Sequence, residues 1–153
     1  MSLEMGNSPS QSMANKVHID VVATLDDGEV KFECSWKMPN GNKGSGPIDL
    51  PRGSGAHHLF FDLDDKTGLK LRYFDDPTDA IWIAVGSCPS GPGNGDGQIA
   101  HSDVDLNRKK LTIHDRNEGG AVDLHYALRF DGDRSKSGPP YNYDPIIRNG
   151  GSV

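Results

Sequence analysis

The sequence is poor in apolar residues and has no long apolar run. Hydrophobic residues make up 34% of the 153 residues, aromatic residues 7%, and the mean hydropathy is −0.61. A membrane-spanning helix needs about 20 consecutive apolar residues, so we expect no membrane partner. Residues 1–15 also lack the basic and apolar regions of a secretory signal. These absences predict a cytoplasmic protein.

Cysteine and basic residues are scarce as well. Cys34 and Cys88, the two cysteines, form neither a Cys-x-x-Cys motif nor a Cys/His cluster with zinc spacing. Without an export signal, we expect both thiols to be free. Sixteen Lys and Arg residues against 22 Asp and Glu residues give a net charge of −6. Because nucleic-acid binding needs a basic surface, we expect no nucleic-acid partner.

Glycine and proline are abundant, at 19 and 10 residues, and separate short segments in which polar and apolar residues alternate. Residues 17–25 and 29–37 alternate on either side of Asp26-Asp27-Gly28, which predicts a β-hairpin. Further strands are expected at 57–63, 69–74, 80–85, 111–114 and 122–130. Residues 80–85 are apolar on both faces, which is typical of a central, doubly covered strand. Trp36 and Trp82 fall inside predicted strands, so we expect both in the core.

Seven to eight short strands and no convincing helix predict an all-β fold, an antiparallel β-sandwich of immunoglobulin-like or cupredoxin-like type. We expect residues 1–15 to be disordered, because their Ser, Asn, Gln and Gly side chains bury too little area to offset ordering entropy. Residues 16–149 then form a single domain, on which residues 133–149 dock as a C-terminal extension. The loop at 87–107 is long enough to be functional or mobile.

A histidine pair on the last predicted hairpin is a candidate metal site. If the hairpin closes with Asn117 opposite Val122, then His114 lies opposite His125. Cross-strand Cβ atoms are about 4.5–5.5 Å apart, so the two imidazoles could share a metal ion. A closure two positions tighter would place Asp123 opposite His114 instead. A solvated sheet face is the competing interpretation, because a tight site usually has three or four ligands.

Other chemistry has less support in the sequence. Oxygen-bearing side chains at Asn94, Asp96, Asp103 and Asp105 make the loop a second candidate metal site, for calcium, although they match no known calcium motif. The order of Cys, His and Met residues excludes a blue-copper centre. The chain has no G-x-S-x-G motif, and no nucleophile has an identifiable partner histidine. We therefore expect neither an enzyme nor a cofactor.

Three apolar residues fall on the polar side of their predicted strands: Val22, Phe60 and Phe74. Together they could form a contact with another subunit, which predicts a homo-oligomer. They could equally lie beneath the long loops or the C-terminal tail. One residue of the His57-His58 doublet must point inward and the other outward, because both belong to one strand.

Several short motifs occur in a fixed order along residues 16–149. They are Leu50-Pro51, Phe61-x-Leu63, Thr67-Gly68, Leu111-x-Ile113-x-Asp115-x-Asn117, Tyr126-x-Leu128-x-Phe130-x-Gly132 and the tail Tyr143-Asp144-Pro145-Ile146-Ile147-x-Asn149. In this order the chain resembles the bacterial DP-EP family of uncharacterised proteins and, more distantly, is similar to the inclusion-body proteins PixA and AidA. The tail is the most specific part, whereas an insertion around residues 87–98 departs from the family.

The resemblance implies an immunoglobulin-like or cupredoxin-like sandwich and supplies neither a reaction nor catalytic residues. The sequence therefore predicts a non-enzymatic binding or self-associating module, whose small ligand, if any, is unknown. The alternative is a metal-binding protein that uses the histidine pair or the acidic loop.

Overall fold

The structure is a computed structural model, and it describes residues 16–38, 41, 43–45, 47–50, 55–95, 97–117, 122–132, 141–143 and 146–149. The segment at 1–15 that we expected to be disordered lies outside the described residues, and so do residues 133–140 of the expected C-terminal extension.

Most of the described residues are in strands, as the alternating sequence predicts. The strands are β1 (Lys16–Asp26), β2 (Glu29–Lys37), β3 (Lys43–Ser45), β4 (Ile48–Leu50), β5 (His57–Asp65), β6 (Arg72–Tyr73), β7 (Ile81–Val85), β8 (Ile99–Val104), β9 (Lys110–Asp115), β10 (Val122–Asp131), β11 (Tyr141–Tyr143) and β12 (Ile146–Asn149). A single turn of helix, α2 (Pro77–Ala80), starts at the capping side chain of Asp76.

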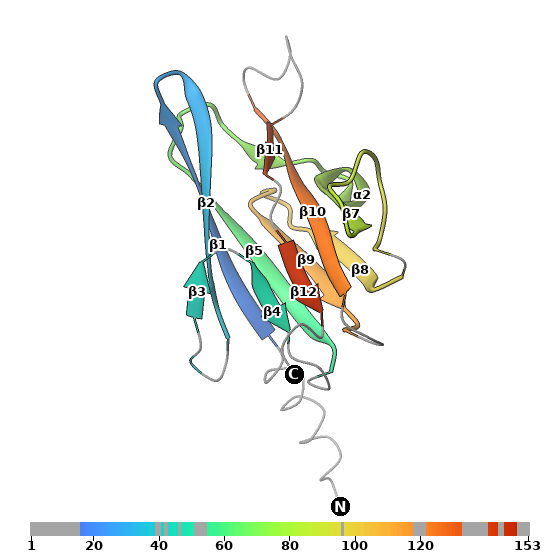
Figure 1. Ribbon diagram of the computed structural model, residues 1–153. Coiled ribbons are helices and arrows are strands. Elements are labelled where there is room, and N and C mark those ends of the chain that lie inside the picture. The colour runs from blue at the N-terminus through green and yellow to red at the C-terminus, as the bar shows by residue number, and fades with distance from the viewer. Residues whose placement is uncertain are drawn as a thin grey trace, which may run out of the picture.

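Two sheets pack face to face, and Figure 1 shows them as the two layers of the molecule. The first sheet has the strand order β3-β2-β1-β5-β9-β8. The second has the order β11-β10-β12-β4, and β6 and β7 also pair with β10. Most pairs are antiparallel, whereas β1/β5 and β4/β12 are parallel. The predicted all-β sandwich is confirmed, with more strands than expected because several short segments also pair.

The β1–β2 hairpin follows directly from its turn sequence. Asp27 and Gly28 both have positive φ, at 54° and 81°, as a two-residue type I′ turn requires. Asp26 therefore pairs with Glu29, and the register continues to His18 opposite Lys37. The alternation turns Val17, Ile19, Val21 and Ala23 of β1 toward the second sheet, where they are fully buried, whereas Leu25 near the turn is exposed.

The core fills the space between the two sheets. The largest fully buried side chains are Tyr73, Tyr126, Phe61 and Phe130. The Phe61 and Tyr126 rings, one from each sheet, have centroids 5.4 Å apart. The Tyr73 hydroxyl donates a hydrogen bond to the Phe61 carbonyl over 3.1 Å, which links the sheets through a buried polar contact.

The predicted hairpin between 111–114 and 122–130 is wrong. Strand β9 pairs with β5 and β8 in the first sheet, whereas β10 belongs to the second sheet. The two strands therefore lie in different sheets and do not pair with each other. Alternation shows which face of a strand is apolar, but it does not identify the neighbouring strand.

Strand β7 is not the central strand that its apolar sequence suggested. It pairs with β10 along one edge, and among the described residues its other edge makes only an isolated bridge, Ile83 to Asn94. Trp82 is half-buried and packs against Arg129 instead of the core. Trp36 is also half-buried, and it packs at the border of the core. The expected loop at 87–107 contains β8, and the expected strand at 69–74 shrinks to β6.

Candidate functional site

The three apolar residues expected at an interface do not share one surface. Val22 and Phe60 lie on the outer face of the first sheet, and both are half-buried. Phe60 is covered by the His18 ring, whose centroid is 5.3 Å away. Phe74 belongs to the other side of the sandwich, where it lies 5.1 Å from the guanidinium carbon of Arg129.

Strand β2 offers an open edge beside Val22. On one side it pairs with β1 along its whole length, but on the other side β3 covers only Ser35–Lys37. Within the described part of the chain, no strand pairs with residues 30–34 on this side. Figure 1 shows β2 and β3 together at one side of the molecule.

The hairpin register determines which backbone groups face this open edge. Residues that flank a two-residue turn form a hydrogen-bonded pair, and every second residue then directs its N–H and C=O toward the neighbouring strand. Asp26 and Glu29 are that flanking pair. The N–H and C=O groups of Val30, Phe32 and Cys34 therefore point away from β1, toward a strand that could be added.

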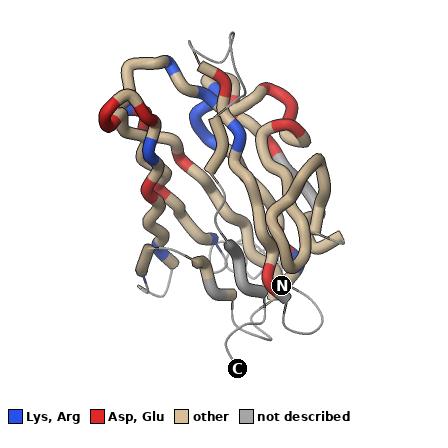
Figure 2. The backbone as a smooth tube through the Cα atoms, turned by 45° about the horizontal axis from the view of Figure 1, so that its top comes forward, with Lys and Arg blue, Asp and Glu red and all other residues tan. Residues whose placement is uncertain are grey.

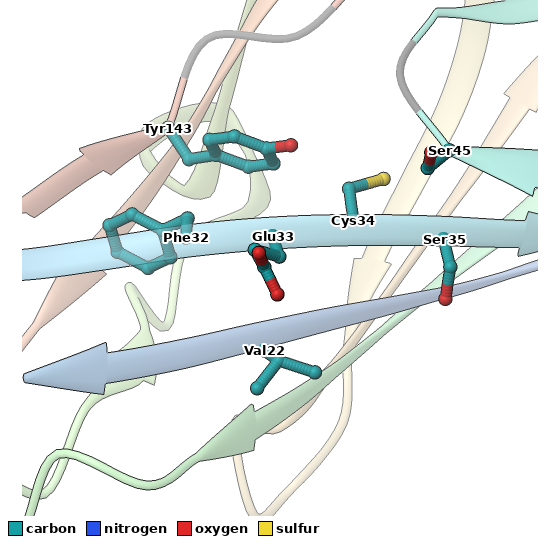
Figure 3. Close-up of a pocket in the computed structure, with 7 residues that line it drawn as sticks. All are labelled: Val22, Phe32, Glu33, Cys34, Ser35, Ser45 and Tyr143. Carbon is teal, nitrogen blue, oxygen red and sulfur yellow. The ribbon is translucent and has the colours of Figure 1, made fainter.

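A groove of about 490 Å³ runs beside this edge, where β2 meets the second sheet. Its residues in Figure 3 include Phe32 and Cys34 from β2, Val22 from β1 and Tyr143 from β11. The rings of Phe32 and Tyr143 stack with centroids 5.5 Å apart. The groove therefore combines half-buried aromatic surface with an open strand edge.

The thiol of Cys34 is held in its protonated form. Burial raises its pKa to about 11, although a hydrogen bond from the Tyr143 hydroxyl to the sulfur acts in the opposite direction. Burial and the neighbouring Cys34 raise the pKa of Tyr143 to about 12. Because the thiolate is the reactive form of cysteine, Cys34 is a poor nucleophile near neutral pH.

Charged side chains alternate along the solvent-facing side of the same edge. Glu29, Lys31 and Glu33 are exposed, and the Lys31 ammonium lies 3.1 Å from the Glu29 carboxylate. Figure 2 shows acidic and basic residues interspersed along the backbone. Both signs of charge are therefore available to pair with another strand.

The histidines predicted to pair, His114 and His125, lie in different sheets. His125 on β10 pairs with Ala84 of β7 and Ile146 of β12. His114 on β9 lies opposite His58 on β5, and the nearest nitrogens of these two rings are 2.9 Å apart. The backbone of His101 on β8 pairs with His114 from the other side. Sequence reasoning missed His58 as the partner, although both residues occupy the polar side of their predicted strands.

The other half of the His57-His58 doublet points inward, as the strand geometry requires. His57 is buried, and its Nδ1 lies 2.8 Å from the Gly55 carbonyl oxygen. Burial lowers the pKa of His57, while the bond to Gly55 opposes that shift. Asp115 is fully buried directly opposite His57, and its carboxylate accepts a hydrogen bond from the Asn117 backbone. These residues form a buried polar end to the sandwich.

In the described part of the acidic loop, Asn94 and Asp105 form local hydrogen bonds. Asn94 accepts a hydrogen bond from the Gly97 N–H, and Asp105 accepts from Lys109 and Lys110 backbone N–H groups. These side chains therefore stabilise turns of the loop itself. Among the residues that the structure describes, no three His, Cys, Asp or Glu side chains are grouped to hold a metal ion. Asp96 lies outside those residues.

Comparison with known proteins does not assign a family. No protein-family model matches this chain, and no curated protein matches it. Among the described residues, no helix is long and apolar enough to cross a membrane.

Proposed function

We propose that the protein is a non-enzymatic module that associates with a second copy of itself through the open edge of β2. The observation that carries the proposal is the length of that edge. Within the described part of the chain, the outward-pointing backbone groups of Val30, Phe32 and Cys34 have no partner strand, because β3 begins to cover β2 at Ser35. A second copy can therefore add its own β2 along five residues.

The centre of this five-residue window sets the register of a symmetric dimer. An antiparallel pair that uses the whole window places Phe32 on the twofold axis, opposite Phe32 of the second copy. Val30 then pairs with Cys34, so the outward-pointing backbone groups of both strands meet. Lys31 pairs with Glu33 twice, once on each side of the axis. The window follows from the backbone groups that point away from β1, without reference to side chains, so this match of charges adds support.

The groove beside the edge supports the same proposal. A second copy on β2 would cover the half-buried rings of Phe32 and Tyr143, which lie next to the axis. Exposed strand edges pair readily unless a charged side chain disfavours it. Lys31 disfavours pairing with a strand that has no acidic residue opposite it, but in the proposed dimer Glu33 of the second copy lies there. A five-residue contact is small, so we expect a concentration-dependent monomer–dimer equilibrium.

The resemblance to the DP-EP family adds support at the level of the fold. The family implies an immunoglobulin-like or cupredoxin-like sandwich, and its more distant relatives form inclusion bodies. The raised pKa of the Cys34 thiol supports a binding role for the groove over a catalytic one.

Sedimentation of charge variants tests the proposal. Each cross-strand charge pair contributes about 0.2–1 kcal/mol, and a reversed charge turns attraction into repulsion at two symmetric places. Lys31→Glu or Glu33→Lys should therefore weaken the dimer by about 1–4 kcal/mol, or roughly five-fold to several-hundred-fold. The double exchange Lys31→Glu with Glu33→Lys should restore the wild-type dissociation constant.

Lys37→Glu is the matched control, because Lys37 is exposed on the same strand but lies outside the window. This variant should dimerise like the wild type. A wild-type protein that stays monomeric at every concentration would contradict the proposal. So would single variants that dimerise as tightly as the wild type.

A further inference from the structure

A second candidate site lies on the outer face of the first sheet, away from the β2 edge. His58 and His114 face each other there from adjacent antiparallel strands, and both are half-buried. His114 Nδ1 and His58 Nε2 are 2.9 Å apart, and the ring planes are inclined at 70° with centroids 4.6 Å apart. In the metal-free protein, one of these nitrogens carries a hydrogen and donates a hydrogen bond to the other.

The same geometry matches two imidazoles that converge on one metal ion. An imidazole nitrogen binds a divalent transition metal at about 2.0 Å, so two nitrogens in cis positions lie about 2.8–2.9 Å apart. The ring centroids would then be about 4.5 Å apart, whereas a head-on hydrogen bond of this length would separate them by about 5.2 Å. The observed 4.6 Å agrees with convergence.

The distance between the two nitrogens also distinguishes between metals. A tetrahedral ion such as Zn²⁺ holds its nitrogen ligands about 3.3 Å apart, which is wider than the observed 2.9 Å. Tetragonal ions hold neighbouring ligands near 90° and accept imidazole and water together. Among such ions, Cu²⁺ has the highest affinity for nitrogen ligands.

We infer that His58 and His114 form a chelating site for a tetragonal divalent metal ion, Cu²⁺ or Ni²⁺, with water in the remaining positions. Both imidazoles are only partly buried, so part of each side chain is open to solvent. His18 is engaged with the Phe60 ring, and the Lys16 ammonium lies over the same ring at 5.8 Å from its centroid. The backbone register places His101 beside His114 on the third strand. This site is separate from the proposed dimer edge.

Titration of the purified protein with Cu²⁺ tests the site. Isothermal calorimetry measures the stoichiometry and affinity of binding, and electron paramagnetic resonance identifies the ligands of the bound ion. A Cys88→Ser background removes the exposed thiol, which would otherwise take up or reduce the ion. We expect one Cu²⁺ per chain and a spectrum with hyperfine splitting from two imidazole nitrogens. His58→Ala and His114→Ala should each weaken binding at least about tenfold, because each leaves a single protein ligand.

His125→Ala is the matched control, because His125 is also a half-buried strand histidine but lies in the other sheet. It should bind Cu²⁺ like the parent protein. Three results would overturn the site: no stoichiometric binding, a spectrum without two nitrogen ligands, or equal affinity in the His58 and His114 variants. The spectrum of the parent protein decides the question even if a variant fails to fold. Failure of this site would leave the dimer proposal unaffected, because no charge variant of β2 touches it.

Discussion

The guanidinium carbon of Arg129 lies 3.9 Å from the ring centroid of Trp82, directly over the indole. Phe74 approaches the same guanidinium from 5.1 Å, and Arg129 Nη1 donates a 3.0 Å hydrogen bond to the Asp79 carbonyl. Arg129 therefore covers two aromatic rings on the outer face of the second sheet and ties them to α2. This arrangement explains why Trp82 is half-buried outside the core.

We expect Arg129→Lys to lower the free energy of unfolding by about 0.5–2 kcal/mol. The ammonium of lysine keeps the charge but loses the flat stacking surface and the directed hydrogen bond. Urea denaturation followed by tryptophan fluorescence measures the change. Arg72→Lys is the control, because Arg72 is exposed in an ion pair with Asp131, and should cost less than about 0.5 kcal/mol. Equal losses in both variants would show that stacking contributes nothing.

The buried His57 should make stability depend on pH. Its pKa is lowered below the ordinary 6.5 by burial, so the unfolded chain binds a proton more readily than the folded protein. The contribution of neutral His57 to the free energy of unfolding is fully present above pH 6.5. It is lost as the pH falls through the lowered pKa of His57 in the folded protein. We expect the free energy of unfolding to fall below pH 6.5, and His57→Asn to flatten that slope. His125→Asn should leave the slope in place; a slope unchanged by His57→Asn would rule out this origin.

Gly44 allows β3 to lie against Trp36. A Cβ atom at position 44 would come within 2.9 Å of the indole Cζ2, closer than real contacts allow. Gly44→Ala should therefore destabilise the protein by about 1–3 kcal/mol, the usual cost of an overpacked contact. Gly91→Ala, where nothing lies within 4 Å, is the matched control for the change of residue. Calorimetric melting of the two variants compares them, and equal melting temperatures would contradict the contact.

The two cysteines should differ sharply in reactivity. Cys88 is exposed, whereas Cys34 is buried with its pKa raised to about 11. At pH 7.5, iodoacetamide should modify Cys88 alone in the folded protein, because alkylation requires an accessible thiolate. Both residues should react after denaturation. Peptide mass spectrometry locates the label, and comparable labelling of Cys34 in the native state would contradict its burial.

The sequence predicted the strands whose signal is local. The alternation over residues 17–25 and 29–37 identifies the two strands of the β1–β2 hairpin, and Asp27-Gly28 between them identifies its turn. Strand β8 went unpredicted because the stretch at 99–104 is rich in small and polar residues. A segment of this kind becomes a strand only through pairing, here with β9. Its β-propensity alone is too weak to identify it.

The alternation patterns do not predict which strands pair when those strands are far apart in the sequence. The polar side of β9 was predicted correctly, but the neighbour of His114 is His58, 56 residues earlier, and not His125. Consecutive strands pair in about two-thirds of cases, which favoured a hairpin between 111–114 and 122–130, but these two strands do not pair. The sequence also does not predict the open window of β2, because that window depends on where the pairing between β3 and β2 ends.

The most direct test of the proposed dimer is to mix its two charge variants. Lys31→Glu places two acids in the window, and Glu33→Lys places two bases there, so each variant alone should dimerise more weakly than the wild type. Together they restore both charge pairs, so native mass spectrometry of the mixture should show a heterodimer about as tight as the wild-type dimer. A mixture that remains monomeric, while both variants keep the wild-type circular dichroism spectrum, would contradict pairing through β2.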